Sequence, residues 1–274
     1  HLQSRNAKKD AAAAILANAQ KDYDTLGDDW AKMETISLQS GALFSDGYFI
    51  AHIEDEMGKI PLNKLVVGHE YNEEVKAMLL RLLLQPEFGL TSSQASDIVA
   101  SIKDWIDADD EPTPGGAESS YYASLQTPYQ AKNAPMDCIE ELLMIKGITK
   151  ELFNGTKDRP PLGQLVTVDS DGRINMNTAP KEVLRSLSDA ITPDLADALD
   201  EYRRREGHDL SDPQWYKRVP SMDAVSIPSD VITVKSSYFK IISTGKMKDM
   251  NKTITAVVQK ADNASVRIVR WRQE

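Results

Sequence analysis

The chain has 274 residues, 41% of them hydrophobic, which is enough for one large domain or two ordinary ones with a buried core. Its formal net charge of −10 makes it a poor general partner for nucleic acid, because phosphates must be neutralised by Lys and Arg. A single cysteine, Cys138, excludes an internal disulfide, and no run approaches the ~20 apolar residues of a membrane helix.

The first part of the chain is predicted to be a helix followed by short strands. Residues 1–34 form the helix, because the Ala-rich run at 11–19 favours it and Ala, Leu and Ile fall on one side. The chain begins at His1, within this helix, so we expect that an N-terminal portion has been removed. Whether that portion contained a membrane segment is a question that the sequence leaves open. Alternating residues at 41–54 predict a strand, and 60–65 a second short one.

The middle of the chain is predicted to be helical. Apolar residues recur at helical spacing, and capping residues begin several of the segments, such as Thr178 before Pro180 and Thr192 before Pro193. The expected helices cover 73–85, 91–107, 134–147, 148–155, 179–188 and 192–206.

After Pro228 the period of the hydrophobic pattern returns to two residues. Four segments alternate as antiparallel strands do: VITVKS, YFKIISTGKM, KTITAVVQK and VRIVRWRQE. Strands therefore lie at both ends and helices in the middle. The pattern predicts an α+β fold in which a helix packs on an antiparallel sheet, with a large all-helical domain inserted between the early and late strands.

The stretch DWIDADDEPTPGGAESSYY at 104–122 is the most unusual in the chain. It holds six carboxylates within fifteen positions, and no Lys or Arg occurs from Asp104 to Ala131. Oxygen-bearing side chains at positions 1, 3, 5, 7 and 12 from Asp107 resemble the ligand spacing of an EF-hand calcium loop. Pro112 stands where the EF-hand needs Gly, and no clear helix is predicted after the loop, so the segment is not assigned as an EF-hand. The carboxylates of so short a loop repel one another, and a bound divalent cation would relieve that repulsion. The alternative to a metal site is a solvated acidic loop at a helix end.

Two segments resemble helix-hairpin-helix modules, which grip the DNA backbone. They are 139–153 and 173–205. Lys146 is the only cation in the hairpin turn of the first, and the second has Ser188-Asp189-Ala190 where its glycine belongs. DNA binding is therefore kept only as the alternative function, since it needs a positive face.

Nothing else in the sequence carries interpretable chemistry. There is no His/Asp/Ser set with a recognisable spacing and no Gly-rich phosphate loop, so no catalytic or cofactor-binding residue is assigned. A hydrolase using the carboxylates of the acidic loop is a third alternative, which would need an apolar pocket around one acid.

Taken in order, several blocks resemble one family. They are YFIAHIEDEMGKIPLNKL (48–65), the acidic stretch, PYQAKNAP (128–135), EELLMIKGIT (140–149), INMNTAPKEVLRSL (174–187) and YFKIISTGKM (238–247). Together they resemble the minor pseudopilin K family of type II secretion systems, also called general secretion pathway protein K. The resemblance covers nearly the whole chain.

The resemblance implies a fold and an assembly role rather than an enzyme. It implies a pilin-like N-terminal helix and first strands in 1–66, an inserted helical domain in 67–227, and strands in 228–274 that complete the pilin-like sheet. Family members lie at the tip of the pseudopilus with the minor pseudopilins I and J, where they initiate or cap assembly for protein export. Contact with secreted substrate proteins is a further expectation, and nucleic acid is not an expected partner.

The resemblance also implies a location and a metal. We expect the periplasmic domain of a bacterial protein anchored in the inner membrane only through an N-terminal segment absent from this chain. The family's helical domain binds calcium, and carrying this over makes Asp107, Asp109, Glu111 and Glu118 the expected ligands. Some relatives are expected to have a disulfide, which Cys138 alone cannot form.

Overall fold

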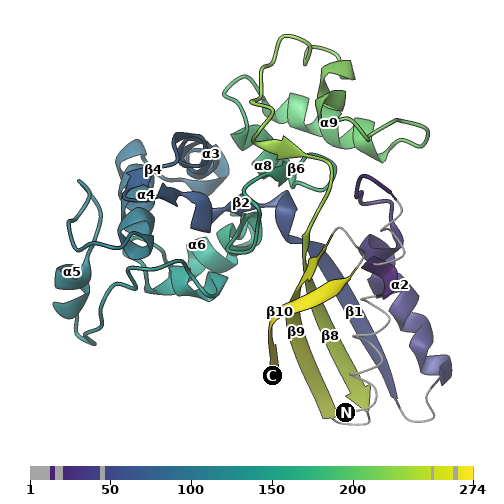
Figure 1. Ribbon diagram of the computed structural model, residues 1–274, viewed down its shortest axis with the longest axis horizontal. Coiled ribbons are helices and arrows are strands. Elements are labelled where there is room, and N and C mark those ends of the chain that lie inside the picture. The colour runs from purple at the N-terminus through teal and green to yellow at the C-terminus, as the bar shows by residue number, and fades with distance from the viewer. Residues whose placement is uncertain (1–12, 16–20, 44–46, 248–249, 262–264, 274) are drawn as a thin grey trace.

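The computed structural model describes residues 13–15, 21–43, 47–247, 250–261 and 265–273. Its main sheet has four antiparallel strands in the order β1-β8-β9-β10. They are β1 (Gly47–Asp55), β8 (Tyr238–Met247), β9 (Met250–Lys260) and β10 (Val266–Gln273). The sheet thus joins one strand from early in the chain to three from its end, as the alternating patterns predict (Figure 1).

One face of this sheet is buried against the segment that precedes β1. Phe49 and Ile53 alternate with more exposed neighbours along β1, and Phe239 and Ile241 do so along β8. Trp30 packs edge-on against Phe239, with 5.2 Å between ring centroids. The period-two pattern therefore builds a small core on this face of the sheet.

The helix expected over residues 1–34 is interrupted. Residues 13–15 are helical, but residues 21–28 form bends and turns before a 3-10 helix at Asp29–Lys32, α2 (Met33–Leu38) and a 3-10 helix at Gln39–Leu43. Gly27 and the aspartates around it disfavour a regular helix there, since Asp28 accepts from the main-chain N–H of Thr25 instead. The rest of the predicted helix lies outside the described residues.

Between β1 and β8 the chain forms seven α-helices among the described residues, joined by 3-10 turns (Figure 1). The α-helices are α3 (Glu73–Leu83), α4 (Ser92–Ile106), α5 (Ser119–Ala123), α6 (Lys150–Asn154), α7 (Leu162–Leu165), α8 (Lys181–Ser186) and α9 (Pro193–Arg204). The 3-10 helices are Glu56–Gly58, Leu62–Lys64, Pro86–Phe88, Ile139–Met144 and Pro213–Arg218. Their apolar faces enclose a second, larger core.

This part of the chain is not wholly helical, contrary to the sequence-based expectation. It contains the two-residue strands β2 (Ile60–Pro61), β3 (Val66–Val67), β4 (Glu70–Tyr71), β5 (Val166–Thr167), β6 (Ile174–Asn175) and β7 (Ile232–Thr233). β2 pairs in parallel with β5, and β6 in parallel with β7. The segments expected to be strands at 60–65 and 231–236 therefore contribute only short pairs outside the main sheet, a long-range pairing that local periodicity does not reveal.

Two helix predictions need correction at their ends. The helix expected at 134–147 is only the 3-10 helix Ile139–Met144, because Glu141 bonds back to the N–H groups of Asp137 and Cys138. Thr178 does not cap α8, whose N-cap is Pro180. The Thr178 hydroxyl donates instead to Asp55 Oδ2 at 2.6 Å.

Asp55 lies where the chain leaves β1, and its side chain bonds to two distant segments. Its Oδ2 accepts from Thr178, from Ser236 Oγ at 2.5 Å and from Asn175 Nδ2 at 3.3 Å. Burial raises the pKa of Asp55 to about 6, against the pull of these hydroxyl donors, and Asp24 nearby raises it further. Asn175 and Thr178 of the INMNTAP block thus connect the region between β1 and β8 to the end of β1.

No helix among the described residues is long and apolar enough to span a bilayer.

Candidate metal centre

The acidic stretch begins at the end of α4, and this helix fixes its start. Thr91 and Gln94 form a capping box at the N-terminus of α4, and Trp105 and Ile106 bury its last turn. Asp107 is the C-cap residue, and the Asp104 side chain accepts from the Thr113 N–H at 3.1 Å, which turns the chain back. The loop is therefore folded against the helix rather than extended into solvent.

Two glycines, Gly115 and Gly116, let the second half of the acidic loop pass close to α4. A Cβ added to Gly116 would lie 2.0 Å from Asp104 Oδ2, and one added to Gly115 would lie 2.3 Å from Asp97 Oδ1. Gly115 also has a φ of +87°, a conformation that side chains disfavour. The Gly-Gly pair therefore places Glu118 opposite the end of α4.

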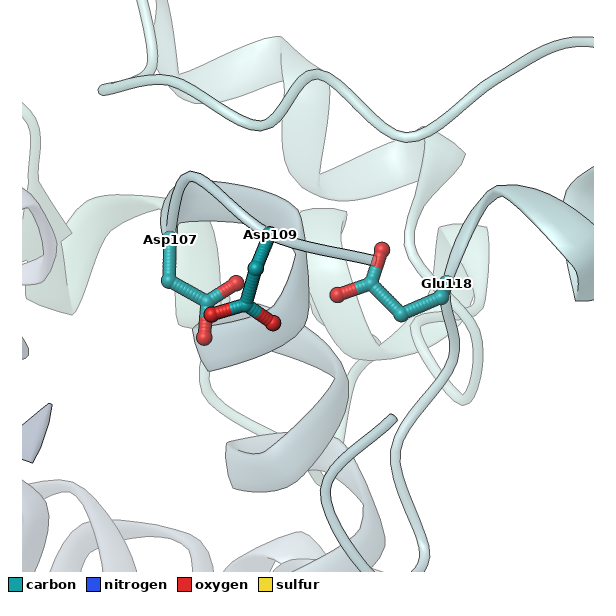
Figure 2. A group of neighbouring side chains, drawn as sticks. All are labelled: Asp107, Asp109 and Glu118. Carbon is teal, nitrogen blue, oxygen red and sulfur yellow. The ribbon is translucent and has the colours of Figure 1, made fainter. Parts of the chain in front are cut away.

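Three of the four predicted ligands come together in this way. One carboxylate oxygen from each of Asp107, Asp109 and Glu118 lies within 4.8 Å of the others. Figure 2 shows Asp107 and Asp109 side by side, with the Glu118 carboxylate directed toward them from the second half of the acidic loop. Glu111 is not part of this group; its side chain is exposed, and it contributes its main-chain N–H to Asp109 Oδ1 at 3.0 Å.

Two of the three carboxylates in the group are buried without enough donors. Asp107 and Glu118 are 2% and 1% exposed. Asp107 Oδ1 and both oxygens of Glu118 have no hydrogen-bond partner among the described residues. Buried acceptors without donors are costly, and a hard cation with oxygen ligands would satisfy all three.

The pKa values reflect this crowding. Burial, together with Asp104, Asp107 and Asp110, raises the pKa of Glu118 to about 7. Burial also raises the pKa of Asp107, despite its ion pair with Lys103. By contrast, the N–H of Glu111 and then His69 hold the pKa of Asp109 below its usual value. The charged forms of Asp107 and Glu118 therefore need a further positive charge.

The spacing of the oxygens suits one calcium ion. Calcium–oxygen distances of about 2.3–2.6 Å put two ligand oxygens at most about 5 Å apart, and the 4.8 Å limit of this group satisfies that condition. The residues present therefore fit the predicted metal.

Sequence reasoning missed four neighbours of this group. Lys103 pairs with Asp107, and His69 Nδ1 lies 2.8 Å from Asp109 Oδ2. Asp104 shapes the loop, and Asn133 donates to the main-chain oxygen of Asp109 at 2.8 Å. Asn133 Oδ1 has no partner among the described residues. The Lys103–Asp107 spacing of four residues on α4 was the only one of these contacts visible as a sequence pattern.

The loop before α5 differs from the prediction in one respect. A five-residue helix, α5, follows Glu118 directly, although no helix was expected there. Tyr122 on α5 is fully buried and packs edge-on against Trp105, with 5.4 Å between ring centroids. The aromatic pair closes the acidic loop at its base.

The first hairpin does not offer a phosphate site. Its cation, Lys146, donates to the main-chain oxygens of Gly115 and Gly116 at 3.0 and 3.1 Å, so it is occupied in holding the acidic loop. In the second segment Asn177 accepts from Trp215 Nε1 at 2.7 Å within the core. Both segments serve packing, and the DNA-binding alternative has no support.

Comparison with known proteins identifies the family. Two family models, both described as type II secretion system (T2SS) protein K, match residues 58–157 and 174–235, which together make up more than half of the chain. Type II secretion system protein K of Pectobacterium carotovorum subsp. carotovorum is 32% identical over 167 residues, which are 60% of this chain and 49% of that protein. A putative type II secretion system protein K of Escherichia coli (strain K12) is 30% identical over 52% of this chain and 43% of its own length. The chain thus spans about half the length of these relatives.

The fold is also similar to a solved one. A chain in the crystal structure of the GspK-GspI-GspJ complex from the enterotoxigenic Escherichia coli type 2 secretion system matches with a TM-score of 0.77. The match has 18% sequence identity and covers 99% of this chain and 94% of the other, so the two folds are alike throughout. By its sequence matches the chain belongs to the type II secretion system protein K family.

Proposed function

We propose that this chain is a minor pseudopilin at the tip of a type II secretion pseudopilus, where it initiates or caps assembly for protein export. The observation that supports the proposal most is membership of the protein K family. The partners would be the minor pseudopilins I and J of the same system, since the similar solved fold comes from a complex of that composition. Contact with the rest of the pseudopilus and with secreted proteins belongs to the same proposal.

The proposed architecture is a pilin-like unit carrying an inserted helical head. The pilin-like unit would comprise 1–66 and 228–274, and the head 67–227. Two separate apolar clusters support a division of this kind, one on the main sheet and one among the helices, with residues 60–65 and 231–234 contributing to the second cluster. A head of this size at a filament end would prevent another subunit from adding beyond it, which is the physical basis of a cap.

The proposed location is the periplasm, with an inner-membrane anchor in an N-terminal segment that precedes this chain in the full protein. A structural role without catalysis fits this location. The carboxylates of the acidic loop, the candidates for hydrolysis, are explained better as cation ligands, because three of them converge and three buried oxygens of Asp107 and Glu118 have no donor among the described residues.

We propose calcium as the ligand of the acidic loop, held by Asp107, Asp109 and Glu118. The ion would supply two positive charges that offset the negative charges of the converging carboxylates. It would also connect the second half of the acidic loop to the end of α4. Lys103 already holds Asp107 through Oδ2 and leaves Oδ1 for the metal. Extracytoplasmic calcium sites are often of low affinity, and such a site would be filled outside the cytoplasm.

The assembly role is tested by titrating this chain into a mixture of purified I and J subunits of the same system, followed by calorimetry. Saturable binding at one chain per I–J pair is expected. A mixture that gives no binding heat in calcium, at several temperatures, contradicts the role. A DNA duplex titrated at low salt serves as the comparison for the alternative function, and no binding is expected there.

A further inference from the structure

Lys103 pairs with one oxygen of the predicted ligand Asp107 and leaves the other oxygen without a partner. It lies in the last turn of α4, four residues before Asp107, and its Nζ donates to Asp107 Oδ2. The two side chains are 12% and 0% exposed, so this is a buried ion pair. Asp107 Oδ1 has no hydrogen-bond partner among the described residues. A metal at Oδ1 would therefore share one carboxylate with the Lys103 ammonium.

The surroundings of Lys103 keep its ammonium beside Asp107. Its Nζ lies 5.7 Å from the centre of the Tyr71 ring, within the range of a cation–π contact. The negative end of the helix dipole also favours a cation in the last turn of α4. The other basic neighbour of the group, His69, is 67% exposed, so solvent screens it far more. Of these two neighbours, Lys103 is therefore the fixed positive charge.

This charge acts first in the protein without metal. Asp107, Asp109 and Glu118 each have a carboxylate oxygen within 4.8 Å of the others, and three like charges so close together repel one another. Lys103 offsets one of these charges from within the fold. Removing one partner of a buried ion pair leaves an uncompensated charge, which is strongly destabilising. Lys103 therefore holds the acidic loop folded when no metal is bound.

The same charge acts against a metal. A cation at one oxygen of a carboxylate and an ammonium at the other are at most about 7 Å apart, given ordinary metal–oxygen and hydrogen-bond lengths. A double and a single positive charge at this separation repel enough to lower the affinity roughly tenfold, even with the screening of bulk water. Lys103 also occupies Oδ2, so Asp107 offers a metal one oxygen where a free carboxylate can offer two.

We propose that Lys103 is a positioning residue that tunes the calcium site: it keeps the acidic loop folded without metal and lowers the affinity of the loop for calcium. This inference rests on the proposed calcium ligand and adds what sets its affinity. The consequence is a loop already shaped for the ion, which fills only where calcium is abundant, as at extracellular sites of low affinity.

Lys103→Met tests both halves of the inference, because it keeps the length and the apolar stem of the side chain and removes the charge. Calcium chloride is titrated into the folded chain in a calorimeter at fixed ionic strength, and the Tm is measured in chelator. The Kd for calcium is expected to fall about tenfold. The Tm in chelator is expected to fall as well, since Asp107 loses its partner. A lysine with a purely structural role would lower the Tm and leave the Kd unchanged.

Further variants separate charge from packing. Lys103→Arg keeps the charge and can keep the bond to Asp107, so its Kd should stay within about threefold of the wild-type value. Lys76→Met is the matched control, because Lys76 Nζ lies 4.2 Å from the centre of the same Tyr71 ring but pairs with Glu73 rather than with a predicted ligand. It should leave the Kd unchanged. Lys103→Gln, which can still donate to Asp107, replaces Lys103→Met in the titration if the latter does not fold.

The outcomes separate this inference from the proposed calcium site. If Lys103→Met binds calcium as well as wild type does, or more weakly, the site stands and the inference fails alone. If wild type binds no calcium but Lys103→Met does, Lys103 opposes the ion as inferred, and the proposed ligand of the wild-type chain is wrong. If neither protein binds calcium, the proposed site fails and the inference falls with it.

Discussion

Without a bound cation, the Glu118 carboxylate is a buried acid that lacks hydrogen-bond donors. Its carboxylate is 1% exposed, and neither oxygen has a donor among the described residues. It lies beside two further acids, and its pKa is raised to about 7 by burial and by that charge. A bound calcium ion reverses the situation, because it turns the same oxygens into ligands.

The first prediction concerns Glu118→Gln, which keeps the shape of the side chain and removes its charge. With calcium at about 100 times its dissociation constant, wild-type protein should gain on the order of 5–10 °C in Tm over the protein in chelator. Glu118→Gln should lose most of this gain. In chelator it should melt at or above the wild-type Tm, since a buried uncompensated charge has gone.

The control for this prediction is Glu206→Gln, a change of the same kind at an exposed position. It should keep the full calcium response. Equal calcium responses in Glu118→Gln and wild type, measured by calorimetry at fixed ionic strength, would remove Glu118 from the ligand set.

The second prediction concerns Asp55 and pH. Its pKa is about 6 in the folded protein and 3.8 for the free side chain, so the folded state binds the proton more tightly. The contribution of Asp55 to stability is therefore fully present below about pH 4 and is lost as pH rises through about 6. A difference of this size corresponds to about 3 kcal/mol in full, of which roughly 2.4 kcal/mol develops between pH 7 and pH 4.

Asp55→Asn isolates this contribution, because the amide does not titrate. The free energy of unfolding of wild type relative to Asp55→Asn should rise as pH falls from 7 to 4. Denaturant unfolding at a series of pH values measures it, and parallel pH profiles for the two proteins would show that Asp55 titrates normally in the fold.

At the scale of elements, the acidic loop depends on close approach as well as on charge. α4 was predictable because it carries its own signals: the Thr91 cap, helical spacing of apolar residues and a clear end at Asp107. The path of the loop was not, since it depends on Asp104 bonding to Thr113 and on Lys146 reaching back to the glycines. The sequence therefore offered four candidate acids, but not the path of the loop that brings Asp107, Asp109 and Glu118 together and leaves Glu111 outside this group.

The third prediction tests this dependence with one extra methyl group. Gly116→Ala places a Cβ 2.0 Å from Asp104 Oδ2, so the loop or the side chain must move. The variant should lose stability by about 1–3 kcal/mol and respond less to calcium than wild type does. Gly245→Ala in β8 is the matched control, because nothing lies within 4 Å of its added Cβ.

Calcium titrations followed by Tm compare the two glycine variants. Gly245→Ala should respond as wild type does. A full calcium response in Gly116→Ala would mean that close approach of the loop to α4 is not needed for the site.

At the scale of the whole molecule, three strands of the main sheet were predicted closely because these long strands alternate clearly. β8, β9 and β10 fall within one or two residues of the expected segments. The two-residue parallel pairs β2–β5 and β6–β7 were not foreseen, since each unites residues about 60 to 110 positions apart that have no pattern of their own. The order of the specific blocks, rather than any single element, identified the family that the comparisons confirm.

The proposed assembly role concerns the whole molecule rather than the acidic loop. Its most direct test is the mass of the particle formed when this chain is mixed with equimolar I and J subunits in calcium, measured by light scattering after gel filtration. We predict one species whose mass equals the sum of the three chains. Three separate peaks, each with the mass of a single subunit, would contradict the account.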